Sequence, residues 1–294
     1  MRAVVLRETG GPEQLQLEEV AEPDEPALRV RAAGVNFMDV LIRRGQYPQM
    51  PELPHVLGGE VAGELDGERV FGFPGGSGGY AERVRVDPQW LFPLPDGASF
   101  EEGASFLMAN LTAWLPLRRV EAETVLVTAA SGGVGSAAVR IGKHLGARVV
   151  AAASTEEKRR FALELGADEA VGYDELPPCD VAFDVVGGDV FAACLPALRP
   201  LGTLIAVGEA GGRWPELDPR LLVGRNVSVQ GFYLGRLMRL APELVRAAAE
   251  EVVELLRSGA VEPVVGETFP LEQVAEAHRL IDERKHVGKV VLTV

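Results

Sequence analysis

Residues 124–153 read TVLVTAASGGVGSAAVRIGKHLGARVVAAA, and this stretch decides the fold of the chain. An apolar run is followed by a glycine-rich turn, a stretch of helical character and a second apolar run. This order is typical of the βαβ unit of a dinucleotide-binding fold. Glycines allow a sharp turn and let a pyrophosphate approach the helix N-terminus, where free N–H groups and the helix dipole favour an anion.

The turn departs from the usual G-x-G-x-x-G pattern, because Ala130 stands where the first glycine is common. A glycine-rich turn by itself is a weak signal, and the alternative is a structural βα turn without a ligand. Because a strand-like run lies on each side of the turn and helix, we expect a nucleotide site. Its turn residues are Ala130, Ser131, Gly132, Gly133, Val134 and Gly135.

The end of the second apolar run indicates which nucleotide binds. An NAD site usually carries Asp or Glu about 20 residues after the glycines, where it holds the ribose 2′-OH. Here that place holds Ala153, Ser154 and Thr155, and a basic run from Lys158 to Arg160 follows. Small hydroxyls and cations suit a 2′-phosphate, which a carboxylate would repel. We therefore expect NADPH; the alternative is that the basic run is an ordinary solvated helix face.

Composition excludes several classes of protein. The 294 residues are 47% hydrophobic and 24% charged, typical of a soluble globular protein with room for two domains. No apolar run is long enough to cross a bilayer, and Met1–Leu6 enters a strand-like pattern at once, so we expect neither membrane insertion nor a signal peptide. The net charge of −14 disfavours nucleic acid and anionic membrane surfaces as partners. Cys179 and Cys194 lack metal-like spacing, which favours reduced core residues of a cytoplasmic protein.

Short strand-like runs between glycine and proline turns predict a compact β-rich domain over residues 1–110. The runs are Ala3–Leu6, Ala27–Ala33, Glu60–Leu65, Arg69–Phe73 and Tyr80–Val86. Helical periodicity begins near Phe100, in 104–108 and 111–117. Alternating strand and helix segments over 124–257 then predict a doubly wound parallel sheet.

The later segments complete the expected domain organisation. Strands are expected at 170–171, 181–184, 202–207 and 227–231, and a helix at 242–258. The tail ends in a strand, 289–294, which we expect to rejoin the first domain. The expected fold is therefore α/β, with a β-rich domain from 1–115 and 260–294 and a Rossmann domain from 116–259.

Several ordered stretches carry a family resemblance over the whole chain. They are AGVNFMD at 33–39 with RGQYP at 44–48, LGGEVAG at 57–63, AASGGVG at 129–135, FDVVGG at 183–188, and AHRL at 277–280 with VGKV at 287–290. Together they resemble the zinc-independent quinone oxidoreductases of the medium-chain dehydrogenase/reductase superfamily. The resemblance implies a GroES-like catalytic domain, a Rossmann domain and a substrate cleft between them.

The residues at the zinc positions of related enzymes lead us to expect no metal. Zinc-dependent members take ligands from a Cys at the position of Asn36 and from a His at the position of Gly59, next to Glu60. Neither substitute is a competent Zn²⁺ ligand, and the four-cysteine lobe that holds structural zinc is absent. His55 is alone, and a single histidine is more typical of a turn or surface.

Without zinc, the acceptor must be electron-poor, as a quinone or an alkene conjugated to a carbonyl is. A hydride then moves from the nicotinamide, and the oxygen that gains charge needs a hydrogen-bond donor. The resemblance implies that Asn36 and Tyr47 lie at this cleft, where an amide and a phenol can donate. The alternatives are that Asn36 bonds backbone and that Tyr47 caps a Tyr-Pro turn, while Asp39 braces the loop.

The resemblance also implies cofactor contacts outside the turn. Thr112 corresponds to a residue beside the nicotinamide, Lys158 to a 2′-phosphate contact and Tyr173 to an aromatic at the adenosine end. The remaining implied contacts are Val207, Gly208, Phe232 and Tyr233 around the nicotinamide half, Arg284 at a phosphate, and Lys289 in the Gly-Lys pair. The alternatives are a solvated helix-end charge for Arg284 and a packing role for Tyr173.

One departure from the family follows Gly63, where a longer hairpin is replaced by Asp66–Gly67. This pair is typical of a two-residue type I′ turn, which needs positive φ at both residues. The fold should survive because the shortening falls at a turn, but a substrate preference taken from longer relatives is less secure.

The expected function is an NADPH-dependent quinone reductase. One alternative is an NADPH-dependent reductase of α,β-unsaturated carbonyls, and another is a non-catalytic NADPH-binding structural or sensor protein. For assembly, Val227–Gln230 resembles an exposed edge strand that pairs with a second copy, which predicts a homodimer. The alternative is that residues 217–224 cover this edge and the protein is a monomer.

Overall fold

The structure is a computed structural model that describes residues 1–294 as two compact units. The first unit comprises Met1–Met108 and Pro263–Val294, and the second unit comprises Ala109–Glu262. The sequence analysis placed the boundaries at 115/116 and 259/260. The boundary between Met108 and Ala109 falls inside helix α2 (Phe100–Leu117), and the helix continues across it without a break. Helical periodicity carries no mark of such a boundary.

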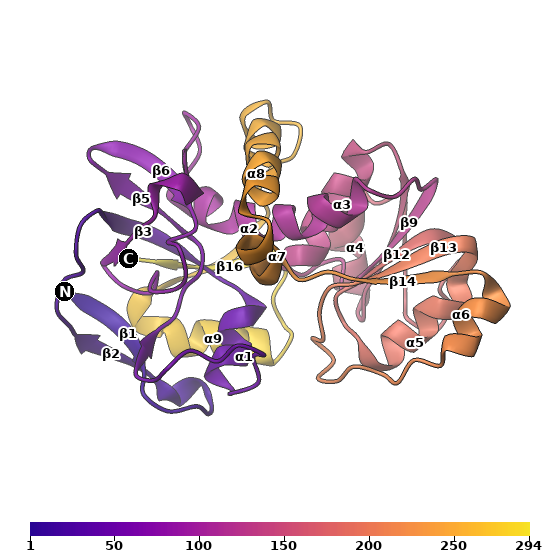
Figure 1. The fold of residues 1–294 in the computed structure, drawn as a ribbon, viewed down its shortest axis with the longest axis horizontal. Helices are drawn as coiled ribbons and strands as arrows, with labels where there is room; N and C mark the ends of the chain where they lie inside the picture. Colours follow the sequence, from indigo (N-terminus) through magenta and orange to yellow (C-terminus); the bar gives the residue numbers. More distant parts are fainter. The chain divides into compact units, whose positions relative to one another are not determined.

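The first unit contains two sheets, in the orders β2-β1-β4 and β15-β16-β3-β5-β6-β8, with β7 also paired to β3. Their bounds are β1 (Arg2–Leu6), β2 (Leu15–Glu19), β3 (Ala27–Val35), β4 (His55–Val56), β5 (Val61–Leu65), β6 (Glu68–Gly72), β7 (Arg83–Arg85), β8 (Leu91–Pro93), β15 (Val265–Pro270) and β16 (Lys289–Thr293). Its shorter helices, α1 (Phe37–Arg43) and α9 (Val274–Asp282), lie side by side (Figure 1).

The C-terminal strand joins the first unit, as the sequence predicts. β16 pairs antiparallel with β3, so that Val290 faces Val35 and Thr293 faces Ala32. The apolar residues of both strands enter one buried core. The short hairpin is also as expected, since β5 and β6 are joined by Asp66 and Gly67 with φ of 52° and 85°. Both angles are positive, as a type I′ turn requires.

The second unit is built on a six-stranded parallel sheet in the order β11-β10-β9-β12-β13-β14 (Figure 1). Its strands are β9 (Thr124–Thr128), β10 (Arg148–Ala152), β11 (Glu169–Val171), β12 (Cys179–Asp184), β13 (Leu198–Ala206) and β14 (Ser228–Gly231). Its helices after α2 are α3 (Gly133–His144), α4 (Glu156–Glu164), α5 (Gly188–Ala197), α6 (Pro219–Arg225), α7 (Leu234–Leu240) and α8 (Pro242–Arg257). The strand order reverses between β9 and β12, the kind of switch point at which nucleotides bind.

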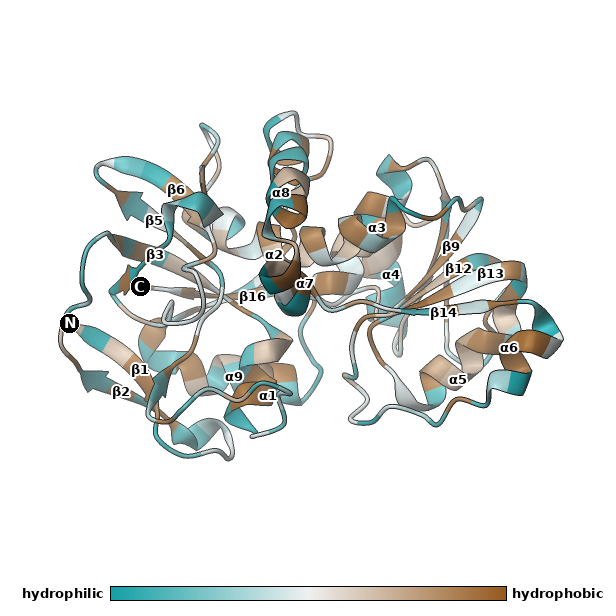
Figure 2. Cartoon of the chain, viewed as in Figure 1, coloured by the Kyte–Doolittle hydropathy of each residue, from teal (hydrophilic) through white to brown (hydrophobic).

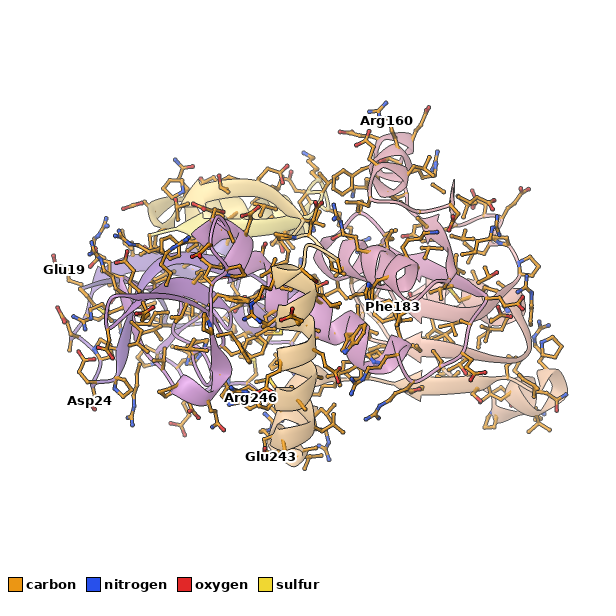
Figure 3. The ribbon with its side chains drawn as sticks, turned by 90° about the horizontal axis from the view of Figure 1, so that it is seen from above. Glu19, Asp24, Arg160, Phe183, Glu243 and Arg246 are labelled. Atoms are coloured by element: carbon orange, nitrogen blue, oxygen red, sulfur yellow. The ribbon has the colours of Figure 1, made fainter.

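The centre of this sheet is apolar on both faces, as parallel strands covered by helices require. Figure 2 colours the central strands β9 and β12 largely in the brown of hydrophobic residues. All of β9 is buried, and Phe183 of β12, labelled in Figure 3, is fully buried. Cys179 and Cys194 are free thiols in the same core. No helix in residues 1–294 combines the length and apolar character that a membrane span needs.

Candidate active site and nucleotide site

The glycine-rich turn joins β9 to α3 in a conformation that explains its composition. Within the turn, the residue whose backbone lies in the left-handed region is Ala129, with φ of 44°. Ala130 does not have a positive φ, so it needs no glycine at its position. Gly132 is the N-cap of α3. A Cβ on Gly135 would lie 2.1 Å from the carbonyl oxygen of Ala129, so only glycine permits this close crossing of helix and strand. The N–H groups of Gly133 and Val134, in the first turn of α3, lie where an anion is favoured.

The predicted cofactor residues of the second unit follow the carboxyl ends of parallel strands. Ser131 follows β9, Ser154 and Thr155 follow β10, Tyr173 follows β11, Val207 and Gly208 follow β13, and Phe232 and Tyr233 follow β14. Because parallel strands end at one edge of a sheet, the fold brings these residues to the same edge. Thr112 lies apart from that set in the sequence, nearly buried on α2.

Two contacts organise this edge. The phenol oxygen of Tyr173 accepts a hydrogen bond from the N–H of Ala129 at 3.1 Å, and the N–H of Ala130 donates to the carbonyl of Ala152 at 3.2 Å. Both therefore hold the glycine-rich turn against neighbouring strands. Tyr173 also packs against the core of the second unit, so the packing role considered for it is real.

The basic run lies on the first turns of α4. The Thr155 hydroxyl caps this helix and accepts the N–H of Lys158 at 3.3 Å. Lys158 and Arg159 are half-buried, and Arg159 donates to the carbonyl of Ala153 at 3.3 Å. Arg160 is exposed and points away from the sheet (Figure 3). The run is therefore not a uniformly solvated face.

Sequence reasoning missed a buried pair at the switch point. The hydroxyl of Thr128, at the end of β9, donates to the carboxylate of Asp184, at the end of β12, at 2.7 Å. The same carboxylate accepts the N–H groups of Val186 and Gly187, both at 3.0 Å. Burial raises the pKa of Asp184. The available signal was an acidic residue that ends an apolar strand directly before the Val-Val-Gly-Gly turn at 185–188.

In the first unit, Asn36 stands between β3 and α1 and begins that helix. Its backbone N–H donates to Asp39 at 2.9 Å, and the other carboxylate oxygen of Asp39 accepts the N–H of Gly58 at 3.1 Å. Asp39 is fully buried, which raises its pKa to about 6. Asp39 therefore braces the loop that carries Asn36.

The side chain of Asn36 belongs to a buried polar cluster with Glu60 and Lys289, here called the Asn–Glu–Lys triad. The Lys289 ammonium donates to Asn36 Oδ1 at 2.5 Å, to Glu60 Oε2 at 3.0 Å and to the carbonyl of Val35 at 3.3 Å. Glu60 is fully buried, and only 4% of Lys289 and 8% of Asn36 are exposed. The sequence analysis assigned Lys289 to the cofactor; the structure directs all three donors of its ammonium into the first unit.

The remaining predicted residues of the first unit lie outside the triad. Tyr47 is half-buried in the loop after α1 and packs against the apolar core. Arg284 is exposed just beyond α9, with φ of 55°. Of the first-unit site residues predicted from sequence, Asn36 and Lys289 are in direct contact.

The donor atoms at the triad do not fit a catalytic Zn²⁺. Asn36 and Gly59 stand at the two positions named above, and neither supplies a thiolate or an imidazole. The Lys289 ammonium already lies against Asn36 and Glu60, and a second cation there would be repelled. Within residues 1–294, no three His, Cys, Asp or Glu side chains are grouped so that they could hold a metal ion.

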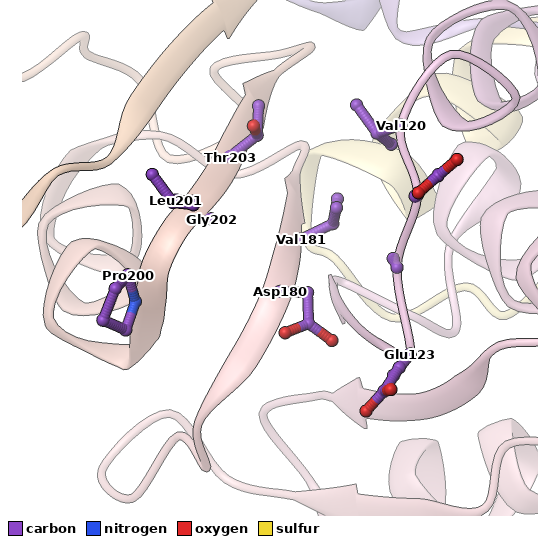
Figure 4. Close-up of a pocket in the computed structure, with 10 residues that line it drawn as sticks. Val120, Glu123, Asp180, Val181, Pro200, Leu201, Gly202 and Thr203 are labelled. Atoms are coloured by element: carbon purple, nitrogen blue, oxygen red, sulfur yellow. The ribbon is translucent and has the colours of Figure 1, made fainter.

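A separate cavity of about 610 Å³ opens near the start of β9 and β12 (Figure 4). Val120, Glu123, Asp180 and Thr203 are among the residues that line it. Asp180 is occupied, because it accepts the N–H of Thr124 at 2.8 Å and pairs with Arg199 at 3.0 Å. This cavity is lined by none of the predicted site residues, and we assign it no ligand.

Comparison with known proteins agrees with this architecture. The model of the alcohol dehydrogenase GroES-like domain matches residues 22–68, and that of the zinc-binding dehydrogenases matches residues 165–292. Quinone oxidoreductase-like protein 2 of Bos taurus is 33% identical over 99% of this chain and 92% of its own length. The quinone oxidoreductase of Pseudomonas aeruginosa is 33% identical over 96% of each chain.

The chain belongs to the quinone oxidoreductase family of the medium-chain dehydrogenase/reductase superfamily. The quinone oxidoreductase of Thermus thermophilus, whose structures include a complex with NADPH, superposes with a TM-score of 0.91 at 39% identity over all of both chains. That of Escherichia coli, complexed with NADPH, gives 0.90 at 29% identity, again over all of both chains. The resemblance and the fold class expected from the sequence, a GroES-like domain with a Rossmann domain, are thereby confirmed. As a member of this family the chain is an oxidoreductase.

Proposed function

We propose that this protein reduces quinones with NADPH and without zinc. The observation that carries the proposal is the Asn–Glu–Lys triad: in a family of quinone oxidoreductases, this chain puts an amide and an ammonium at the position where zinc-dependent relatives have metal ligands. An acceptor that needs no Lewis acid must itself be electron-poor, and a quinone satisfies that condition.

The second unit supplies most of the proposed NADPH site. NADPH, when bound, supplies the hydride. The turn from Ala130 to Gly135 would hold the pyrophosphate at the start of α3, since its free N–H groups and the helix dipole favour an anion there. Ser154, Thr155 and Lys158 would hold the 2′-phosphate, because no carboxylate follows β10 until Glu156 in the first turn of α4. The other proposed contacts are Tyr173 at the adenosine end, Thr112, Val207, Gly208, Phe232 and Tyr233 at the nicotinamide half, and Arg284 at a phosphate.

Asn36 and Tyr47 are the proposed hydrogen-bond donors to the acceptor. The amide of Asn36 and the phenol of Tyr47 would stabilise the oxygen that gains negative charge as the hydride arrives. Donors fixed before the reaction are worth more than solvent, because they need not reorganise. The buried surroundings of Asn36 favour such an arrangement.

We further propose that two copies pair through β14 and that the enzyme works in the cytoplasm. β14 pairs only with β13, so its other edge has no strand partner within the chain, and Ser228 on it is exposed. An isologous contact of this kind closes at a dimer. Light scattering should give twice the chain mass of 31.4 kDa, and a mass near 31.4 kDa would exclude the dimer. The buried thiols of Cys179 and Cys194 are compatible with a reducing compartment.

Steady-state kinetics test the proposed activity directly. Rates of NADPH oxidation are measured with a panel of quinones and a matched panel of α,β-unsaturated carbonyl compounds. Turnover of quinones above background supports the proposal. Turnover of the unsaturated carbonyls alone would reassign the enzyme to that class, and NADPH binding without turnover of either panel would favour a non-catalytic binding protein.

A further inference from the structure

The two ends of the Asn36 side chain are held very differently. Its Oδ1 is 2.5 Å from the Lys289 ammonium, a short charge-assisted contact. Its Nδ2 donates to the carbonyl of Gly34 and to Glu60 Oε2, both at 3.3 Å, at the long end of the hydrogen-bond range. The amide is therefore anchored by its oxygen and held weakly at its nitrogen.

Charge in the triad permits only this orientation of the amide. Turning the group over would put an NH₂ against an ammonium, donor against donor, and an oxygen against the carboxylate of Glu60. In this buried place the Lys289 ammonium is paired with Glu60 Oε2 at 3.0 Å. Glu60 is itself fixed, since its Oε1 accepts the N–H of Met108 at 2.8 Å.

Close packing keeps the triad in place. A Cβ on Gly34 would lie 2.0 Å from the carbonyl oxygen of Ala104 and 2.9 Å from Glu60 Oε2, so β3, α2 and the carboxylate meet with no spare room. A side chain that must adopt one orientation in a packed interior is a pre-organised one.

We propose that Lys289, with Glu60 as its counter-ion, is a positioning residue that fixes the orientation of the Asn36 amide, so that its NH₂ and not its oxygen meets the acceptor. With the ammonium against the amide oxygen, Asn36 would meet an incoming molecule through its NH₂, which gives up one of its two long contacts, to the carbonyl of Gly34 or to Glu60 Oε2. Such a site suits an acceptor oxygen that carries lone pairs, as in a quinone or carbonyl. This inference rests on the proposed function, in which Asn36 contacts the acceptor.

The test compares four forms of the enzyme: the unaltered protein, Lys289→Met, Asn36→Ala and the double variant. We expect Lys289→Met to lower kcat/KM for a quinone at least tenfold, and Asn36→Ala by about 100-fold, the range for losing one donor to a developing oxyanion. If Lys289 acts through Asn36, the double variant should be no worse than Asn36→Ala alone. The Kd for NADPH, measured by fluorescence titration, should stay within about twofold in all forms.

Three further variants serve as controls for this comparison. Lys143→Met removes a lysine from a half-exposed ion pair with Asp168 and should leave kcat/KM unchanged. Asn36→Asp keeps an oxygen for Lys289 but lacks the amide N–H, and should be as inactive as Asn36→Ala. Should Lys289→Met fail to fold, Glu60→Gln with Lys289→Met removes both buried charges together and takes its place.

A spectroscopic measurement reports on the amide without any acceptor. The chain has only three asparagines, Asn36, Asn110 and Asn226, so the Asn36 NH₂ signal can be assigned by its loss in Asn36→Ala. That signal should move or broaden in Lys289→Met, while those of the other two asparagines stay in place.

The outcomes separate the two proposals. A Lys289→Met enzyme with unchanged kcat/KM, a double variant whose loss is the product of the single losses, or an NADPH Kd weakened tenfold would each overturn the positioning role. If the unaltered enzyme binds NADPH but reduces no acceptor, the proposed function itself fails, whatever the variants do.

Discussion

The phenol oxygen of Tyr173 accepts a hydrogen bond from the backbone N–H of Ala129 at 3.1 Å, across 44 residues of sequence. Ala129 is also the left-handed residue of the glycine-rich turn, with φ of 44°. A side chain from the end of β11 therefore helps to hold the backbone from which the turn begins. Tyr173 thus supports the proposed nucleotide site before any nucleotide is bound.

Tyr173→Phe should weaken NADPH binding moderately. One neutral hydrogen bond contributes about 0.5–1.5 kcal/mol, which corresponds to a two- to tenfold rise in Kd. Fluorescence titration measures this change. Tyr47→Phe is the matched control, because Tyr47 packs in the first unit and should leave the NADPH Kd unchanged. Equal affinities for Tyr173→Phe and the unaltered protein would show that the turn needs no such support.

Lys158 should decide between NADPH and NADH. We expect the unaltered protein to bind NADPH at least about tenfold more tightly, because one charge-assisted contact is worth about 1.5–3 kcal/mol. Lys158→Glu should erase or invert this preference. Arg160→Glu makes the same charge change at an exposed position that points away from the sheet, so it should preserve the preference. Equal affinity of the unaltered protein for both nucleotides would contradict the prediction.

Gly135→Ala should disrupt the turn between β9 and α3. Its Cβ would lie 2.1 Å from the carbonyl oxygen of Ala129, a backbone atom that cannot move aside without shifting the turn. We expect a loss of several kcal/mol in stability and of NADPH binding. Gly224→Ala, on α6 where nothing lies within 4 Å of the added atom, is the control and should be neutral or slightly stabilising. Both are measured by thermal unfolding.

Asp184→Asn should destabilise the second unit by about 2–3 kcal/mol. The amide nitrogen cannot accept from Val186 or Gly187, so at least one buried N–H loses its partner. Thr128→Val removes the hydroxyl that donates to Asp184 and accepts the N–H of Val185, but it keeps the carboxylate that accepts from Val186 and Gly187, so it should cost less. Asp189→Asn, which follows the turn at the start of α5 and is 92% exposed, should cost almost nothing. Urea unfolding, followed with a probe in the second unit, measures the loss of stability in each variant. The expected order of loss is Asp184→Asn, then Thr128→Val, then Asp189→Asn, and any other order would contradict the prediction.

Asp39 and His278 should have opposite effects on how the stability of the first unit depends on pH. Burial raises the pKa of Asp39 from 3.8 to about 6, so within this window the folded state keeps a proton that the unfolded state has lost. This contribution to stability therefore falls as pH rises. Burial, aided by Arg43, lowers the pKa of His278 from 6.5 to about 3, so there the unfolded state holds the extra proton. That contribution rises with pH.

Single variants should separate the two groups. Where the windows overlap, each contributes a slope of about 1.4 kcal/mol per pH unit, and the two nearly cancel in the unaltered protein. Asp39→Asn should therefore lose stability more steeply than the unaltered protein as pH falls from about 6 to about 4, and His278→Gln should become relatively more stable. Urea unfolding at several pH values within this window tests both. Parallel pH profiles for the variants and the unaltered protein would contradict the assignment.

The parallel sheet of the second unit was largely predictable from the sequence. Apolar strands, glycine turns and amphipathic helices repeat there in order, and local patterns suffice when neighbours in sequence are neighbours in space. Helical periodicity was likewise expected from about Phe100, through 104–108 and 111–117, and helix α2 runs from Phe100 to Leu117.

In the first unit, the strands and contacts that the sequence did not predict depend on residues that are distant in sequence. β4 has only two residues and no periodicity to detect. β15 is short, half-exposed and pairs with β16 out of regular register. Likewise, Asn36 and Lys289 are separated by 253 positions, so no spacing rule links them. The sequence identified both residues, but their direct contact depends on the pairing of β3 with β16.

That pairing also sets an order of events during synthesis. The second unit is continuous from Ala109 to Glu262, so every strand of its sheet has left the ribosome before β16 is made. The first unit must wait, with β3 lacking one neighbour and Glu60 lacking its cation, until residues 289–293 emerge. Nascent chains therefore pass through a stage in which the nucleotide-binding half is complete and the half that carries Asn36 is not.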